Sequence, residues 1–151
     1  MRESSIEFRV RYCESDQMGV VHHANYLAWC EMGRTDLMRQ LGVSYAELEH
    51  RGVYLPVSEV RVRFRSPARF DERIRVRTSV TRLRSRGVSF AYEVENPETG
   101  VALASAETDL VCIDRGGATR TLPDDVRAVL VRALSTPERG NLETRSGVQL
   151  E

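Results

Sequence analysis

Residues 6–42 read IEFRVRYCESDQMGVVHHANYLAWCEMGRTDLMRQLG, and the hydrophobic period changes once within this run. Residues 6–13 alternate apolar with polar side chains, which predicts a strand. Residues 23–41 carry a broad apolar stripe at helical spacing, and Gly42 then supplies a helix stop. We therefore expect a strand, a turn rich in polar side chains and a long helix.

The rest of the chain predicts more strands and two further helices. Ser44 and Glu47 have the spacing of a capping box, which predicts a short helix that ends near Gly52. Residues 126–134 predict a C-terminal helix, whereas residues 135–151 lack a pattern and are expected to be a disordered tail. Four alternating segments separated by turn signals predict strands at residues 57–64, 74–83, 88–94 and 103–113.

These elements predict one α+β domain over residues 1–134. Five antiparallel strands would wrap around the long central helix, with the short second helix and the C-terminal helix outside that core. A length of 151 residues and a hydrophobic content of 41% suit a single globular domain. Such a sheet leaves an edge exposed, so we expect pairing with a second copy.

The N-terminus and the apolar runs bear on location. No apolar run approaches the ~20 residues that a membrane-spanning helix needs. Residues 1–5 are not followed by an apolar signal segment. We therefore expect a cytoplasmic protein without stable membrane insertion.

Arginine recurs at every second position in two predicted strands, which places each trio on one face. Such a face fits either a nucleic-acid surface or a solvated face balanced by carboxylates. The formal net charge is zero, which argues against the long-range attraction that nonspecific nucleic-acid binding needs. No nucleic-acid partner is therefore expected for these arginines, which are Arg61, Arg63, Arg65, Arg73, Arg75 and Arg77.

The turn between the first strand and the long helix groups an acid, a glycine and two histidines. Asp16 either caps this turn or provides a reactive carboxylate. Gly19 permits a backbone conformation that residues with a Cβ resist. The helix that begins near His23 offers unbonded N–H groups, which can bind a developing oxyanion.

The adjacent histidines are not expected to bind a metal. Neighbouring side chains on a strand or turn point apart, and no third ligand stands at metal-binding spacing from His22 and His23. We expect neither a metal nor a cofactor.

Residues 10–39 resemble the signature of the 4-hydroxybenzoyl-CoA thioesterase family of hotdog-fold proteins. The likeness is greatest to the bacterial acyl-CoA thioesterase branch that is encoded with the Tol-Pal system. It continues through residues 66–71, 86–87 and 122–123. Position 22 is usually aromatic in this branch and is His22 here. The matching residues are Tyr12, Ser15, Asp16, Gly19, Val20, Val21, His23, Ala24, Asn25, Tyr26, Glu31 and Arg34.

The resemblance implies a hotdog fold that hydrolyses a coenzyme A thioester at a dimer interface, within a homodimer that assembles into a homotetramer. Asp16 matches the catalytic carboxylate, acting as nucleophile or as general base. The backbone N–H of His23 is expected to bind the thioester oxygen. The residues expected to bind the substrate are Gly19, Val20, His22, Asn25 and Tyr26. Those expected to contact coenzyme A near its phosphates are Arg84, Ser85, Arg86 and Ser89.

Glu31 matches a recurrent acid of the family, and we expect it to pair with Arg34 at i,i+3 spacing. Two other functions stay open. One is a non-catalytic module that binds acyl-CoA or acyl carrier protein, or that serves as a scaffold; the other is a hotdog hydratase or dehydratase. Acyl carrier protein also stays open as the carrier of the substrate, and the residues do not identify the acyl group.

Overall fold

The computed structural model describes residues 3–134 and contains one antiparallel sheet with the strand order β1-β3-β4-β5-β2. The predicted five-stranded α+β architecture is confirmed. The predicted tail over residues 135–151 lies outside the described part. The elements in chain order are β1 (Glu3–Arg9), the 3₁₀ turn η1 (Tyr12–Glu14), α1 (Ala24–Gln40), α2 (Tyr45–His50), β2 (Val57–Phe64), β3 (Arg73–Arg84), β4 (Gly87–Glu95), β5 (Ala102–Val111) and α3 (Asp124–Ala133).

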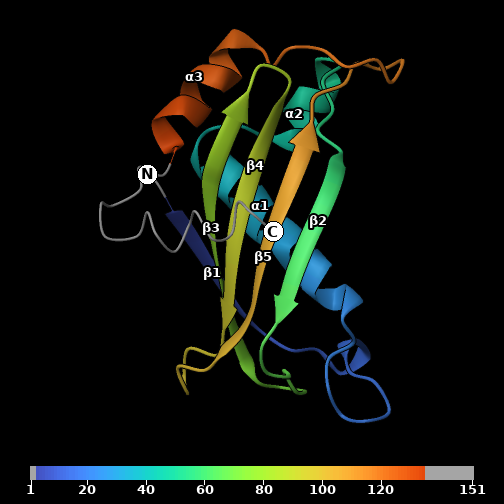
Figure 1. Cartoon of the computed structure of the whole chain (residues 1–151), viewed down its shortest axis with the longest axis vertical. Helices are drawn as coiled ribbons and strands as arrows, with labels where there is room; N and C mark the ends of the chain where they lie inside the picture. Colours follow the sequence, from blue (N-terminus) through green and yellow to red (C-terminus); the bar gives the residue numbers. More distant parts are fainter. Residues whose placement is uncertain (1–2, 135–151) are drawn as a thin grey trace.

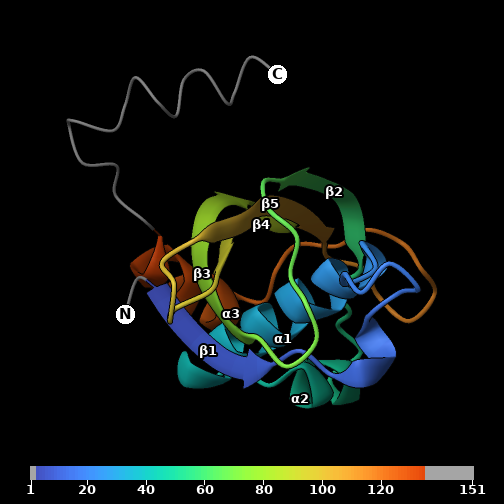
Figure 2. The same ribbon diagram turned by 90° about the horizontal axis from the view of Figure 1, so that it is seen from below.

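The sheet curves around α1, which lies in its concave face (Figures 1 and 2). Helix α1 packs on β1, β3 and β4, while α3 packs on β3. Trp29, Leu37 and Met38 of α1 are almost wholly buried in this contact. Each such side chain contributes about 1.5–3 kcal/mol when removed from water, so the apolar face of α1 accounts for its position.

A glycine sets how closely α1 approaches the sheet. A Cβ at Gly33 would lie 2.5 Å from Thr78 Oγ1 and 3.1 Å from Val76 Cγ1. Glycine in a helix interior is unfavourable by about 0.5–1 kcal/mol relative to alanine. The close packing of α1 on β3 therefore explains why a glycine stands here.

Strand β1 ends earlier than the alternation of residues 6–13 predicts. Its ladder with β3 runs from the Glu3–Ser79 pair to the Arg9–Arg73 pair. Residues 12–14 then turn as η1, because the Glu14 side chain accepts the Arg11 N–H at 2.7 Å. The other predicted elements agree with the structure to within a few residues, and Ser44 caps α2 by accepting from the Glu47 N–H.

Strand β2 lies at an edge of the sheet and, among the described residues, pairs only with β5. Seven of its eight residues are exposed, and Val62 is half-buried. Val57, Val60 and Phe64 are apolar side chains of this strand that remain 39%, 39% and 51% exposed. No element within residues 3–134 covers this edge.

The arginine-rich face of the sheet is balanced by carboxylates. Arg61 pairs with Glu107 at 2.6 Å and with Glu59 at 3.3 Å. On β3, ion pairs join three arginines to acids on neighbouring segments: Arg73 with Glu7 and Glu98, Arg75 with Glu7 and Glu95, and Arg77 with Glu95. These pairs favour the interpretation of a solvated, charge-balanced face.

None of the helices in residues 3–134 combines the length and the apolar composition needed to cross a membrane.

Candidate active site

The loop between η1 and α1 folds as a small hairpin with residues 16–19 at its tip. The Gly19 N–H donates to the Asp16 carbonyl at 3.0 Å, and the Asp16 N–H donates to the Val20 carbonyl at 2.8 Å. Gly19 has φ +79°, in the left-handed region that glycine adopts without strain. Val20 forms a bridge to Arg69, which holds the hairpin against the connection between β2 and β3.

Asp16 caps its own turn. Its Oδ1 atom accepts the N–H groups of Met18 at 2.8 Å and Val20 at 3.3 Å, and the residue is exposed. The other oxygen, Oδ2, accepts no hydrogen bond from residues 3–134. The carboxylate is thus oriented through one oxygen, while the second is open to solvent and able to take a proton or attack a carbonyl carbon.

Helix α1 begins at the other end of this loop, with His23 as its N-cap. The Ala24 N–H donates to His22 Nδ1 at 3.3 Å, and Asn25 Nδ2 donates to the carbonyls of Glu14 and His22. Within residues 3–134 the His23 N–H has no acceptor. An N–H at a helix start, reinforced by the helix dipole, suits a carbonyl oxygen that becomes negative.

The two histidine rings do not point apart as expected. Their centroids are 4.2 Å apart with an interplanar angle of 32°. His23 has helical backbone angles, φ −55° and ψ −31°, so the alternation of a strand does not apply to this pair. The part of the chain that the structure describes contains no group of three or more His, Cys, Asp or Glu residues arranged to hold a metal.

A cavity of about 270 Å³ opens beside the start of α1, and we call it the His23 pocket. One predicted catalytic residue, His23, and one predicted substrate-binding residue, Tyr26, line it together with Phe64 and neighbouring residues. The Tyr26 hydroxyl accepts the Ala68 N–H at 3.3 Å, and burial raises the pKa of this phenol. The other predicted residues lie outside the lining: Asp16, Gly19, Val20, His22 and Asn25.

Glu14 holds the loop to α1, and no sequence pattern had singled it out. Its side chain is buried, with Oε1 accepting from the Arg11 N–H at 2.7 Å and Oε2 from Trp29 Nε1 at 2.8 Å. Its carbonyl accepts the His22 N–H at 2.9 Å. Burial by itself raises the pKa of this carboxyl, but the hydrogen bonds from Arg11 and Trp29 outweigh it and hold the pKa below its usual value.

The predicted coenzyme A residues lie elsewhere in the chain. Arg84, Ser85 and Arg86 lie at the β3–β4 hairpin, at the end of the sheet opposite the Asp16 loop (Figure 1). Arg86 donates to Thr119 Oγ1 at 3.4 Å, and the buried Ser89 donates to an Asp109 carboxylate oxygen. Within one chain the structure does not bring these residues to Asp16.

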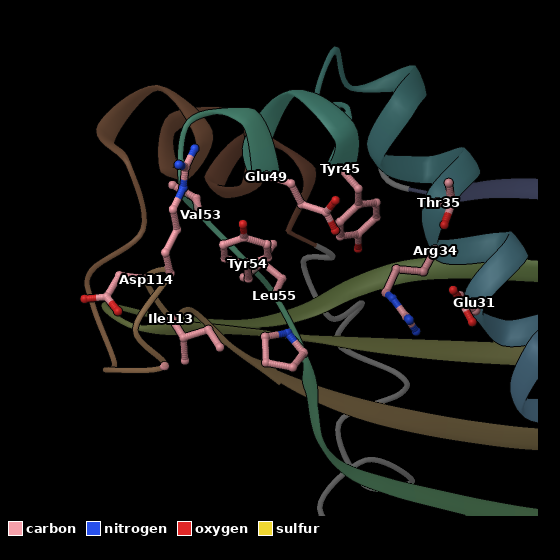
Figure 3. A pocket seen from close by; sticks show the side chains of 13 residues that line it. Glu31, Arg34, Thr35, Tyr45, Glu49, Val53, Tyr54, Leu55, Ile113 and Asp114 are labelled. Carbon is pink, nitrogen blue, oxygen red and sulfur yellow. The ribbon is translucent and has the colours of Figure 1, made fainter.

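The predicted pairing of Glu31 with Arg34 is wrong. Arg34 is buried and its Nη1 donates to the Tyr92 hydroxyl at 3.0 Å, whereas Glu31 is exposed. Helical spacing allows the pair, but the Arg34 side chain projects from α1 into the cavity that Tyr45 also faces (Figure 3), and its hydrogen bond goes to Tyr92.

Comparisons with known proteins identify the family to which the chain belongs. The sequence profile of the thioesterase-like superfamily matches residues 10–130, and the chain belongs to this superfamily. The putative acyl-CoA thioesterase YneP of Bacillus subtilis (strain 168) is 36% identical over 115 residues, which cover 76% of this chain and 83% of YneP.

Two solved structures share the fold. The hypothetical protein TT1821 from Thermus thermophilus is 40% identical with a TM-score of 0.83, and the match covers 89% of this chain and 99% of that one. The DHNA-CoA thioesterase from Staphylococcus aureus is 29% identical with a TM-score of 0.84, covering 97% of this chain and 96% of that one. The expected hotdog fold, a sheet wrapped around α1, is confirmed.

Proposed function

We propose that this chain hydrolyses the thioester of an acyl- or aroyl-coenzyme A to a free acid and coenzyme A. Membership of the thioesterase-like superfamily supports this activity, as do relatives named as thioesterases of acyl-CoA and DHNA-CoA. The structural observation that carries the proposal is the start of α1. There the His23 N–H, which has no acceptor within residues 3–134, lies beside a pocket of about 270 Å³.

Asp16 supplies the reactive carboxylate in this proposal. In one route it attacks the thioester carbonyl carbon, the thiolate of coenzyme A leaves, and water hydrolyses the resulting anhydride. In the other route it removes a proton from the water that attacks the same carbon. Both routes place negative charge on the carbonyl oxygen, which the His23 N–H and the dipole of α1 stabilise.

We infer that a second copy completes the site by pairing antiparallel along β2. The exposed apolar side chains of this edge strand support the pairing, since an unpaired edge is a template for another strand. A two-fold axis across β2 reverses the second sheet. The β3–β4 hairpin of the second copy, with Arg84 and Arg86, then comes to the end that carries Asp16 in the first. A homotetramer of two such dimers stays a prediction of the family resemblance, as does acyl carrier protein as an alternative carrier.

Replacing Asp16→Asn tests the reaction. Asparagine retains an oxygen that can accept the N–H groups of Met18 and Val20, so the turn should survive. Thioester hydrolysis should fall by about 10²–10⁴-fold, since the variant can neither attack nor deprotonate water. Thiol release from short-chain, long-chain and aromatic acyl-CoAs measures the activity, with thermal unfolding and molar mass as controls. Unchanged turnover would exclude this role, and binding without hydrolysis in the wild type would favour the non-catalytic module.

A further inference from the structure

A second cavity, of about 530 Å³, lies between α1, α2 and the segment that leads into β2 (Figure 3). We call it the Arg34 pocket. It shares no lining residue with the His23 pocket, and its volume lies within the range of about 300–1,000 Å³ that small-molecule sites occupy. Val53, Leu55 and Ile113 give it apolar walls, and Arg34 and Tyr45 give it polar groups.

The guanidinium of Arg34 is buried without a balancing carboxylate. Arg34 is 8% exposed, and arginine stays charged at any ordinary pH. Its hydrogen bond from Nη1 reaches a neutral group, the Tyr92 hydroxyl, and Arg34 forms no ion pair within residues 3–134. The Arg34 Nε–H has no partner among these residues either. A buried charge in this state is unfavourable until an acceptor reaches it.

A second polar group faces the same space. The Tyr45 hydroxyl is buried beside the Arg34 guanidinium and interacts with it electrostatically, but no hydrogen bond of good geometry joins it to any group in the described part of the chain. Burial raises the pKa of Tyr45 to about 12, so at neutral pH the phenol keeps its proton and can donate it in a hydrogen bond. Figure 3 shows the Arg34 guanidinium and the Tyr45 ring projecting into one cavity from α1 and α2. A ligand that satisfies both must bring acceptor oxygens.

The acids of the pocket do not supply this acceptor. Glu31 and Glu49 are exposed, so water solvates and screens them. Asp114 Oδ1 accepts the N–H groups of Gly116 and Ala118 and is held in its own turn. The buried part of the pocket is therefore positive and donor-rich, and its walls are apolar.

We propose that the Arg34 pocket binds a free monocarboxylic acid. The carboxylate accepts from the Arg34 guanidinium and the Tyr45 hydroxyl, and the apolar body of the acid packs against Val53, Leu55 and Ile113. Such acids are the class of product that thioester hydrolysis releases; this link to the reaction rests on the proposed function, whereas the binding itself does not.

Titration calorimetry on the full chain tests the site with hexanoate and benzoate, and with hexanamide and benzamide as neutral counterparts. The acids should bind at least about tenfold more tightly than the amides, because only the carboxylate forms charge-assisted hydrogen bonds with Arg34. Tyr45→Phe keeps the ring and should weaken acid binding about fivefold by removing one donor. Arg34→Gln should abolish binding, and Tyr45→Phe keeps the test decisive if Arg34→Gln does not fold.

Two further variants supply matched controls. Glu49→Gln removes a negative charge near the mouth and should tighten acid binding about twofold. Asp16→Asn should bind the acids as the wild type does, whatever it does to hydrolysis, so failure of this proposal can be told from failure of the proposed reaction. Any of these results overturns the inference: no acid binding by the wild type, equal affinity for acid and amide, no loss in Tyr45→Phe, undiminished binding in a folded Arg34→Gln, or weaker binding in Glu49→Gln or Asp16→Asn.

Discussion

Asp16 and Glu14 are carboxylates that lie two residues apart and have different roles. Asp16 is exposed and accepts two N–H groups through Oδ1 alone. Glu14 is buried and uses both oxygens, one for the Arg11 N–H and one for Trp29. An ionised group that is fully hydrogen-bonded is suited to holding structure, whereas a partly bonded, solvent-facing one is suited to chemistry.

Glu14→Gln should therefore destabilise the fold in a pH-dependent way. The folded-state pKa of Glu14 is lowered, so its ionised form stabilises the fold above the unfolded-state pKa of about 4.3, and this is lost as pH falls through the lowered value. At neutral pH the variant should lose about 1–3 kcal/mol in free energy of unfolding. The difference in free energy of unfolding between the wild type and the variant should shrink below about pH 4.

Urea unfolding at a series of pH values measures this gap. Glu31→Gln, which changes an exposed carboxylate on α1, is the control and should shift the free energy of unfolding by less than about 0.5 kcal/mol. A gap between wild type and Glu14→Gln that stayed constant down to about pH 3 would contradict the assigned ionic role.

His22 stands where the resembling branch usually has an aromatic ring, and its structural role is now visible. Its Nδ1 accepts the Ala24 N–H at the start of α1, and its ring lies against that of His23. Only the His23 N–H is then left without an acceptor at this helix start, within residues 3–134. His22 thus places a flat ring beside His23 and a nitrogen that accepts an N–H at the start of α1.

At the scale of elements, the packing of α1 on β3 depends on Gly33. Gly33→Ala gains about 1 kcal/mol of helix propensity, but its methyl group would meet Thr78 Oγ1 at 2.5 Å. Overpacking usually costs about 1–3 kcal/mol, so we expect a net loss of about 1–2 kcal/mol in urea unfolding. Met32→Ala at an exposed neighbouring position should change stability little. A more stable Gly33→Ala protein would show that α1 can move away from β3 at no cost.

Element boundaries were predictable where a local pattern ends at a local signal. Strand β2 and the cap of α2 are such cases, because alternation and a capping serine are properties of neighbouring residues. The end of β1 was not. It depends on the Glu14 side chain, whose partner Trp29 lies fifteen residues further along the chain. The alternation of residues 6–13 does not depend on that contact and so could not predict it.

At the scale of the whole molecule, the exposed β2 edge governs the expected assembly. Val60→Glu places like charges close to the two-fold axis of the proposed pairing, where they repel. We expect the molar mass from light scattering to fall to that of a smaller species, with loss of hydrolysis. Val101→Glu is the control, since Val101 is similarly exposed but lies in the turn between β4 and β5 and is not part of β2. An unchanged mass for Val60→Glu would exclude pairing through this strand.

The contribution of a second copy to the site can be tested directly. Arg86→Ala should raise the KM for acyl-CoA about three- to tenfold with little change in kcat, because a phosphate contact acts on binding. Arg39→Ala, at another exposed arginine, should have no such effect.

Mixed oligomers identify which copy supplies the arginine. If Arg86 comes from the second copy, mixing Asp16→Asn with Arg86→Ala chains creates one intact site per mixed dimer, with the KM of the wild type. If both residues act within one chain, every active site in the mixture keeps the raised KM.

Neighbouring residues alone were enough to place the five strands, the three helices and the Asp16 turn of residues 3–134, because period-two alternation, helical stripes and capping signals are local. The folding of distant segments onto each other decided the rest. In the folded chain Arg34 donates to Tyr92 and does not pair with Glu31, and the β3–β4 hairpin lies far from Asp16. A cavity is also enclosed between α1 and α2. The physical reason is burial: which side chains lose water, and which partners they then require, depends on contacts between residues far apart in the chain.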